Sequence, residues 1–302
     1  MEEILGHNVI LDFFEKVKAN NKMSHAYCFV GPKNVGKMTV AKYLGAQILG
    51  VKPEKIFTSP DFFLLEQIIK EKTGKLGKDI SIDQVRELVN FVSKRSFLGG
   101  YKIVIIDNAH LLSTSASNAI LKTLEEPSEK TVIFLITDDD KKILPTILSR
   151  CQTINFSTVS DEILRIFLKK NNLSTEDIDF IQKYSCGLPG IAVKLMSDSE
   201  YLIMYKNEIE RFRNLFGKLF FEKLKLVEEL FGDKKDHIQA RNNLVDVLDI
   251  WQTCLHLDIQ EKENLDKATF LNIYNSIENA KVLLGKNVHP RLLIENILLQ
   301  II

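Results

Sequence analysis

Short apolar runs alternate with stretches of helical periodicity over the first half of the chain. Five runs rich in β-branched and aromatic residues have the length of buried strands: 26–30, 61–66, 101–107, 131–137 and 151–156. Three stretches between them carry apolar residues at helical spacing: 38–49, 81–94 and 115–126. This alternation indicates a mostly parallel sheet with helices on both faces. We therefore predict an α/β domain over residues 1–157.

The pattern changes after residue 157, where strand-like runs stop. Residues 160–171 and 175–187 read as amphipathic helices, and Gly187–Gly190 reads as a break between helices. From 201 to the end, nearly all apolar positions follow helical spacing. We predict a small helical domain over 158–200 and an all-helical domain over 201–302.

Composition and charge narrow the class of protein. Forty basic residues balance forty acidic ones, whereas a protein that grips DNA alone through many phosphate contacts is more often basic. No run approaches the roughly 18–20 apolar residues of a membrane span. The four cysteines are isolated, so we expect neither a zinc site nor a disulfide framework. The first residues lack a signal-peptide pattern, and we expect a cytoplasmic location.

The segment GPKNVGKMT (31–39) has the spacing of a phosphate-binding loop. Gly31 and Gly36 lie between a predicted strand and a predicted helix, where backbone N–H groups and the helix N-terminus can surround phosphate oxygens. Lys37 would reach the outer phosphates. The alternative interpretation is a glycine turn that joins strand to helix and leaves Lys37 in solvent.

The positions that would carry out chemistry at this loop are altered. Met38 stands where a Ser or Thr hydroxyl should hold magnesium, and Thr39 is one residue late, rotated by about 100° around the helix. Asp107 ends a buried strand and fits a magnesium shell, although it also fits a cap for the following turn. Asn108 follows it, and an amide cannot act as a general base. We expect a degenerate nucleotide site.

Three segments make the chain resemble a known family. SHAYCFVGPKNVGK (24–37), NAILKTLEEPSEKTVIFLIT (118–137) and LPTILSRCQTINF (144–156) together resemble the delta-prime subunits of the bacterial DNA polymerase III clamp loader. The resemblance spans about residues 5–195, and the 201–302 segment matches only in length and helical character. It implies an AAA+ P-loop domain, a helical lid and a helical collar that closes a pentameric ring.

The resemblance implies a function in replication. It suggests a clamp-loader subunit that belongs to the DNA polymerase III holoenzyme and has no ATPase activity of its own. The implied partners are the tau/gamma and delta subunits and, through the complex, the sliding clamp and primer-template DNA, with no membrane. The alternative is an ATP-hydrolysing subunit of the tau/gamma type.

Ser149-Arg150-Cys151 matches the SRC motif of this family, whose arginine acts in trans on ATP bound by a neighbouring subunit. The planar, permanently charged guanidinium of an arginine can stabilise the negative charge that develops on phosphate oxygens. From the pattern alone, Arg150 fits a surface salt bridge equally well. We expect Cys151 to be a packed small residue rather than a reactive thiol.

Further departures from active AAA+ proteins concern the nucleotide. Gly190 stands where those proteins place a sensing arginine, and Thr137 matches a polar residue at a strand tip. The acids 138–140 after it would repel phosphate, or form a solvated turn. Residues 50–63 lack the cysteines of the zinc cluster found in many relatives. We expect weak ATP or ADP binding at most, and no zinc.

Overall fold

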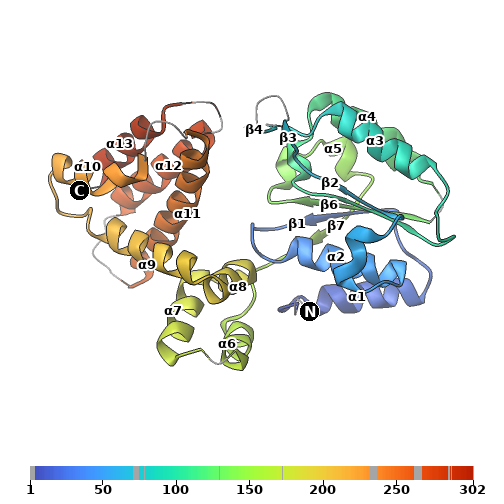
Figure 1. The fold of residues 1–302 in the computed structure, drawn as a ribbon, viewed down its shortest axis with the longest axis horizontal. Helices are drawn as coiled ribbons and strands as arrows, with labels where there is room; N and C mark the ends of the chain where they lie inside the picture. The colour runs from blue at the N-terminus through green and yellow to red at the C-terminus, as the bar shows by residue number, and fades with distance from the viewer. Residues whose placement is uncertain are drawn as a thin grey trace. The chain divides into compact units, whose positions relative to one another are not determined.

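The computed structural model describes residues 4–70, 75–77, 79–128, 130–171, 173–231, 237–261, 267–284, 286 and 288–301. The chain divides into two compact units, Met1–Ala192 and Val193–Ile302. The first unit contains the sheet and the second is built of helices (Figure 1).

A five-stranded parallel sheet forms the centre of the first unit. Its strands are β1 (Ala26–Val30), β2 (Phe62–Leu65), β5 (Lys102–Ile106), β6 (Thr131–Thr137) and β7 (Gln152–Asn155). Their order is β2-β5-β6-β1-β7, and each neighbouring pair runs parallel. Every strand lies within one residue of its predicted range at each end, so the α/β prediction is confirmed. A small antiparallel pair, β3 (Ile69–Lys70) and β4 (Lys75–Leu76), lies outside this sheet.

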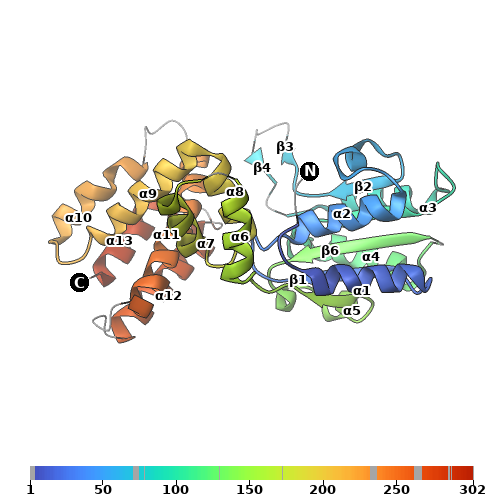
Figure 2. The same cartoon turned by 90° about the horizontal axis from the view of Figure 1, so that it is seen from below.

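Helices cover both faces of the sheet. On one side lie α1 (Asn8–Ala19) and α2 (Lys37–Leu49), and on the other α3 (Ile82–Ser93), α4 (Thr114–Glu125) and α5 (Pro145–Leu148) (Figure 1). Figure 2, seen from below, shows α1 and α2 in front of the strands. Because side chains alternate along a strand, Ile103 and Ile105 pack with α1 and α2, while Val104 and Ile106 pack with α3 and α4. The sheet thus separates two hydrophobic cores.

Local sequence signals explain where α3 begins and which face it buries. The Ser81 hydroxyl accepts a hydrogen bond from the Gln84 N–H at 3.4 Å, and the Gln84 side chain accepts one from the Ser81 N–H at 3.0 Å. This is the predicted capping box. Val85 and Leu88 are fully buried against the sheet. Three 3₁₀ turns complete the connections: η1 (Pro53–Thr58), η2 (Ala109–Leu111) and η3 (Asp140–Lys142).

Three helices follow the sheet: α6 (Asp161–Lys170), α7 (Thr175–Ser185) and α8 (Pro189–Ser197). The predicted break between helices is narrower than Gly187–Gly190, because α8 already begins at Pro189. Proline is suited to a first helical position, where its missing N–H has no partner to lose. Gly187 forms the turn, with φ of +74° and no room for a Cβ, which would lie 2.8 Å from the Val159 carbonyl oxygen.

The second unit contains α9 (Ser199–Arg213), α10 (Phe220–Val227), η4 (Glu228–Phe231), α11 (His237–Glu261), α12 (Lys267–Leu284) and α13 (Pro290–Gln300). Phe212 and Trp251 are fully buried, with ring centroids 5.4 Å apart, and they link α9 to α11. Within the described residues this unit has no strand, as its helical periodicity predicts. The finer division into 1–157, 158–200 and 201–302 stays a prediction. Among the helices described in both units, none is long and apolar enough to cross a membrane.

Candidate functional site

The predicted phosphate loop connects β1 to α2. A Cβ at Gly31 would lie 2.4 Å from the Phe156 carbonyl oxygen, so the end of β1 approaches the end of β7 too closely for any other residue. Gly36 precedes α2 with φ of +105°, a backbone conformation that favours glycine. Both glycines are therefore needed to join this strand to this helix, whether or not a ligand binds.

Lys37 turns its ammonium back into the loop. Its Nζ donates to the Pro32 carbonyl oxygen at 2.7 Å and to the Gly31 carbonyl oxygen, and the residue is only 7% exposed. The interpretation that places Lys37 in solvent is therefore wrong. Burial lowers the pKa of Lys37, while the nearby carboxylates of Asp138 and Asp107 oppose that shift.

Asp107 and Asn108 follow β5 at the same edge of the sheet. Burial raises the pKa of Asp107, against the effect of the Asn108 backbone N–H and the Lys37 ammonium. The Asn108 side-chain amide donates to an Asp107 oxygen at 3.1 Å, and Asn108 has φ of +49°. The carboxylate is thus held by its neighbour in the chain, in a turn where asparagine is well tolerated.

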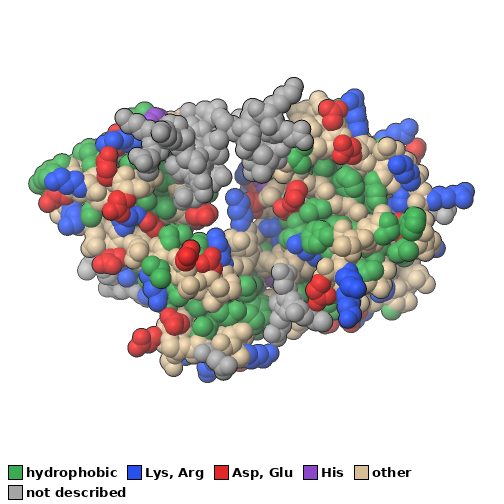
Figure 3. Space-filling model, viewed as in Figure 1, with side chains coloured by type: hydrophobic (Ala, Val, Ile, Leu, Met, Phe, Trp, Pro, Cys, Tyr) green, Lys and Arg blue, Asp and Glu red, His purple; other side chains and the backbone are tan. Residues whose placement is uncertain are grey.

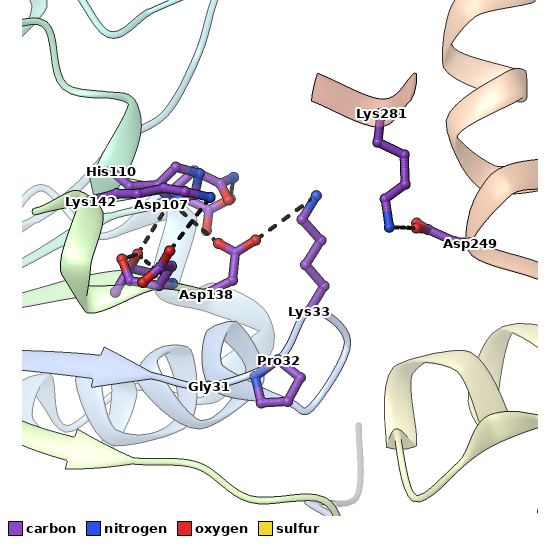
Figure 4. Close-up of polar contacts among 12 residues, drawn as sticks. Gly31, Pro32, Lys33, Asp107, His110, Asp138, Lys142, Asp249 and Lys281 are labelled. Atoms are coloured by element: carbon purple, nitrogen blue, oxygen red, sulfur yellow. Dashed lines mark hydrogen bonds and ion pairs between the residues drawn. The ribbon is translucent and has the colours of Figure 1, made fainter. Parts of the chain in front are cut away.

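The end of β6 contributes a polar cluster beside the loop (Figure 4). Thr137 is fully buried, and its hydroxyl lies 3.2 Å from His110 Nδ1 and donates to the Asp139 carbonyl oxygen at 2.9 Å. Asp138 lies 3.3 Å from His110 Nδ1 and 3.9 Å from Lys33 Nζ. Burial lowers the pKa of His110, and Asp138 opposes the shift. The polar groups at this strand tip are paired with one another.

A magnesium–nucleotide complex fits these residues poorly. Met38 packs its side chain against the hydrophobic core between the sheet and α1 and α2, and it offers no oxygen to a metal. Thr39 is partly buried in the first turn of α2. The site therefore keeps the form of a phosphate loop with altered chemical groups.

Gly190, at the start of α8, lies directly against this loop. Its backbone N–H donates to the Asn34 carbonyl oxygen at 2.8 Å. A Cβ at position 190 would lie 2.9 Å from that oxygen, so a longer side chain such as arginine has no room there in this arrangement.

Arg150 lies just after α5, away from the phosphate loop in the sequence. Its Nη1 donates to the Thr146 carbonyl oxygen at 2.8 Å and to the Ser149 hydroxyl at 3.3 Å, and its Nη2 meets Glu125 Oε1 at 2.5 Å. The side chain is 33% exposed. The guanidinium is therefore oriented by three partners and still reaches the surface.

The other two residues of the SRC motif have local structural contacts. Ser149 donates its hydroxyl to the Thr146 carbonyl oxygen at 3.1 Å, which closes the end of α5. Cys151 packs against the core beneath α3 and α4, and burial raises the pKa of its thiol to about 12. A thiol with this pKa is almost entirely protonated near neutral pH, so Cys151 is chemically quiet.

Two buried charges that sequence analysis did not single out fix the loop before β5. The Asp61 carboxylate is 1% exposed and accepts hydrogen bonds from the Ser96 hydroxyl and from the N–H groups of Phe97 and Leu98, at 2.9, 2.7 and 2.9 Å. Lys102 is 4% exposed and donates to carbonyl groups at the end of α3. The sequence did contain a signal for this pairing, since Asp61 and Lys102 lie at the starts of two predicted strands. A charge beside a buried strand needs a partner.

The surface carries both signs of charge. Figure 3 shows Lys, Arg, Asp and Glu side chains interspersed over the visible face, in keeping with the equal numbers of basic and acidic residues.

Comparison with known proteins relates this geometry to a family. Residues 6–160 match a family model described as "DNA polymerase III, delta subunit". The chain is 39% identical over 142 residues to DNA polymerase III subunit delta' of Pseudomonas aeruginosa, covering 42% of each chain. It is 35% identical over 137 residues to the protein of the same name in Haemophilus influenzae, covering 45% of this chain and 42% of that protein. The matched region thus spans about two fifths of the length of these curated relatives.

Solved structures of other proteins resemble this chain in fold. A DNA polymerase III gamma subunit-related protein from Thermotoga maritima has a TM-score of 0.56 at 19% identity, covering 95% of this chain and 97% of that one. The RuvB Holliday junction branch migration motor from the same organism has a TM-score of 0.50 at 17% identity, covering 99% and 89%. The predicted AAA+ domain followed by a helical region is therefore confirmed as a fold.

Proposed function

We propose, since this chain belongs to the DNA polymerase III delta-subunit family, that it is a clamp-loader subunit of the delta-prime type. In this role it completes the ring of the loader and takes part in loading a sliding clamp onto primed DNA. It does so without hydrolysing ATP itself, and it lends Arg150 to the ATP site of a neighbouring subunit.

The contact between Arg150 and Glu125 carries the proposal. It joins the two motifs on which the family resemblance rests, LKTLEEP and SRC, through one ion pair of 2.5 Å. The pair orients a guanidinium that is one-third exposed. Its described contacts, with Glu125, Thr146 and Ser149, include no residue of this chain's own phosphate loop. A fork held in this way can meet the oxygens of a phosphate presented by another chain.

The chain's own phosphate loop supports a non-hydrolytic role. Met38 is partly buried and packs against a hydrophobic core, and Asn108 stands where a general base would be needed. Position 38 therefore lacks a hydroxyl for the metal, and position 108 lacks a carboxylate that could accept a proton. ATP that drives clamp loading would have to be bound and hydrolysed by other subunits.

The partners follow from this role. We propose tau/gamma-type and delta-type loader subunits as ring neighbours, and the sliding clamp and primer-template DNA as partners reached through the complex. A chain of zero net charge is compatible with collective binding of DNA, in which several subunits share the phosphate contacts. The proposed location is the cytoplasm.

A second candidate is an ATP-hydrolysing subunit of the tau/gamma type. The chain is 29% identical over 168 residues to DNA polymerase III subunit tau of Bacillus subtilis, covering 54% of this chain and 30% of that protein. Met38 and Asn108 argue against this candidate, because both positions have lost the groups that hydrolysis needs.

Two measurements separate these candidates. The purified chain is first assayed alone for ATP hydrolysis, and a delta-prime-type subunit is expected to show no turnover above the buffer control. It is then mixed with tau/gamma-type and delta-type subunits of the same organism, and co-elution as one complex with ATPase activity is expected. Robust turnover by the isolated chain would favour the tau/gamma type, and failure to enter the complex would contradict both candidates.

A further inference from the structure

The backbone carbonyls of the phosphate loop are held by groups of this same chain. The carbonyls of Gly31 and Pro32 accept from Lys37 Nζ. Two carbonyls in the middle of the loop accept hydrogen bonds from other parts of the chain. The Asn34 carbonyl accepts from the Gly190 N–H of α8, and the Val35 carbonyl accepts from His7 Nε2, each at 2.8 Å. The loop thus connects α8, the segment before α1 that contains His7 (the N-terminal segment) and the first turn of α2.

The contact with α8 depends on glycine because no larger residue has room there. A Cβ at position 190 would lie 2.9 Å from the Asn34 carbonyl oxygen, 3.0 Å from its Cβ and 3.1 Å from its Cα. Two of these atoms are backbone, so they cannot turn aside as the end of a flexible side chain can. Gly190 lies in the first turn of a helix and has no positive φ. Close approach, rather than backbone conformation, therefore accounts for the glycine.

The N-terminal segment also contacts the loop, through His7. The His7 ring packs edge-on against Phe156, with centroids 4.9 Å apart, and its Nε2 donates to the Val35 carbonyl. Phe156 in turn is the residue whose carbonyl lies against Gly31. His7, the end of β7 and the phosphate loop therefore form one packed cluster.

We infer that the phosphate loop of this chain is a structural joint, which fastens α8 and the N-terminal segment to the sheet without any nucleotide. A loop that serves a nucleotide is organised around phosphate oxygens by its N–H groups and its lysine. Here Lys37 is committed to loop carbonyls, and α8 lies in direct contact with the loop backbone. The residues that make these contacts, His7, Asn34, Lys37 and Gly190, all lie in the first unit, so the role does not depend on membership of a ring.

Hydrogen exchange on the full-length chain tests this inference. Exchange is followed by mass spectrometry for peptides covering residues 31–37 and 187–197, in the wild type and in Gly190→Ala. The wild type is expected to show the same protection with and without magnesium and ATP. Gly190→Ala is expected to exchange about tenfold faster in both peptides, because the added methyl group breaks the hydrogen bond to Asn34.

Gly100→Ala is the matched control, because a Cβ there meets nothing within 4 Å and the residue has no positive φ. It should leave both peptides unchanged. His7→Ala is a second variant in case Gly190→Ala does not fold, and it should speed exchange of residues 31–37. Unchanged exchange in either folded variant overturns the inference, as does protection of α8 that develops in the wild type only when ATP is added.

Discussion

The Arg150 guanidinium meets the Glu125 carboxylate at 2.5 Å, at the point where the end of α4 faces the end of α5. The side chains are 33% and 49% exposed, and ion pairs so close to solvent contribute only about 0–1 kcal/mol to stability. The main effect of the contact is therefore to orient the Arg150 guanidinium rather than to stabilise the fold. We therefore propose that Glu125 positions Arg150.

Replacing this carboxylate separates positioning from stability. Glu125→Ala should leave the thermal midpoint close to that of the wild type, because the pair is exposed, yet lower the ATPase of a reconstituted loader about fivefold through loss of orientation. Glu126→Ala is the control, since its side chain is exposed in the same motif. Equal loader activity for the two variants would argue against the positioning role.

Asp61 is expected to be a large local contributor to stability. It accepts three hydrogen bonds from the loop before β5 while almost fully buried. Asp61→Asn leaves part of that set unpaired and should cost about 2–3 kcal/mol in the free energy of unfolding, measured by urea denaturation. Asp83→Asn, in an exposed pair with Arg86, should change it by less than about 0.5 kcal/mol.

Asp61 should also make the free energy of unfolding depend on pH. Burial alone would raise the pKa of Asp61, but the N–H groups of Leu98 and Phe97 and the Ser96 hydroxyl outweigh it, so its pKa lies below the ordinary value. A carboxyl with a depressed pKa stabilises the fold above its unfolded pKa of about 3.9 and loses that contribution as pH falls through the folded pKa. The difference between wild type and Asp61→Asn should therefore shrink below about pH 4. A gap that stays constant down to pH 2 would be inconsistent with this account.

Lys37 should matter for folding more than for catalysis. Lys37→Met removes the donor to two loop carbonyls, and it is expected to cost about 1–2 kcal/mol of stability. The ATPase of the reconstituted loader should change little, because Met38 leaves this loop without a hydroxyl for a metal ion. Lys33→Met, at a side chain that is 65% exposed, controls for loss of charge. A folded Lys37→Met variant that abolished loader activity would show that the loop does more than hold structure.

The sequence predicts the centre of the sheet well because β1, β5 and β6 are buried on both faces. Runs such as 131–137 contain only side chains that suit that environment, so they are recognisable without knowledge of their neighbours. The capping box at Ser81 is likewise a local signal. By contrast, the four-residue α5 was not predicted, since a short helix has few periodic positions and depends on its tertiary contacts. The 12-residue α1 was not predicted either, and its length does not explain the omission.

The contacts that define the candidate sites could not be predicted from the spacing of residues along the sequence. Arg150 and Glu125 are 25 positions apart, and Gly190 lies 156 positions from Asn34. A missing arginine at position 190 is visible in the sequence, but the close approach that requires glycine depends on where the fold places α8. The buried pairing of Lys37 was missed for the same reason, because a lysine beside a glycine-rich turn is equally compatible with solvent.

Arg150→Ala in a reconstituted loader is the most direct test of the central claim, that this chain supplies an arginine to ATP bound by a neighbour. The variant should fold, enter the complex and melt like the wild type, because its ion pair is partly exposed. Arg86→Ala, at another exposed arginine, is the matched control. The account predicts that kcat for clamp- and DNA-stimulated ATP hydrolysis falls at least about tenfold in Arg150→Ala and stays unchanged in Arg86→Ala. Unchanged hydrolysis by a fully assembled Arg150→Ala complex would contradict it.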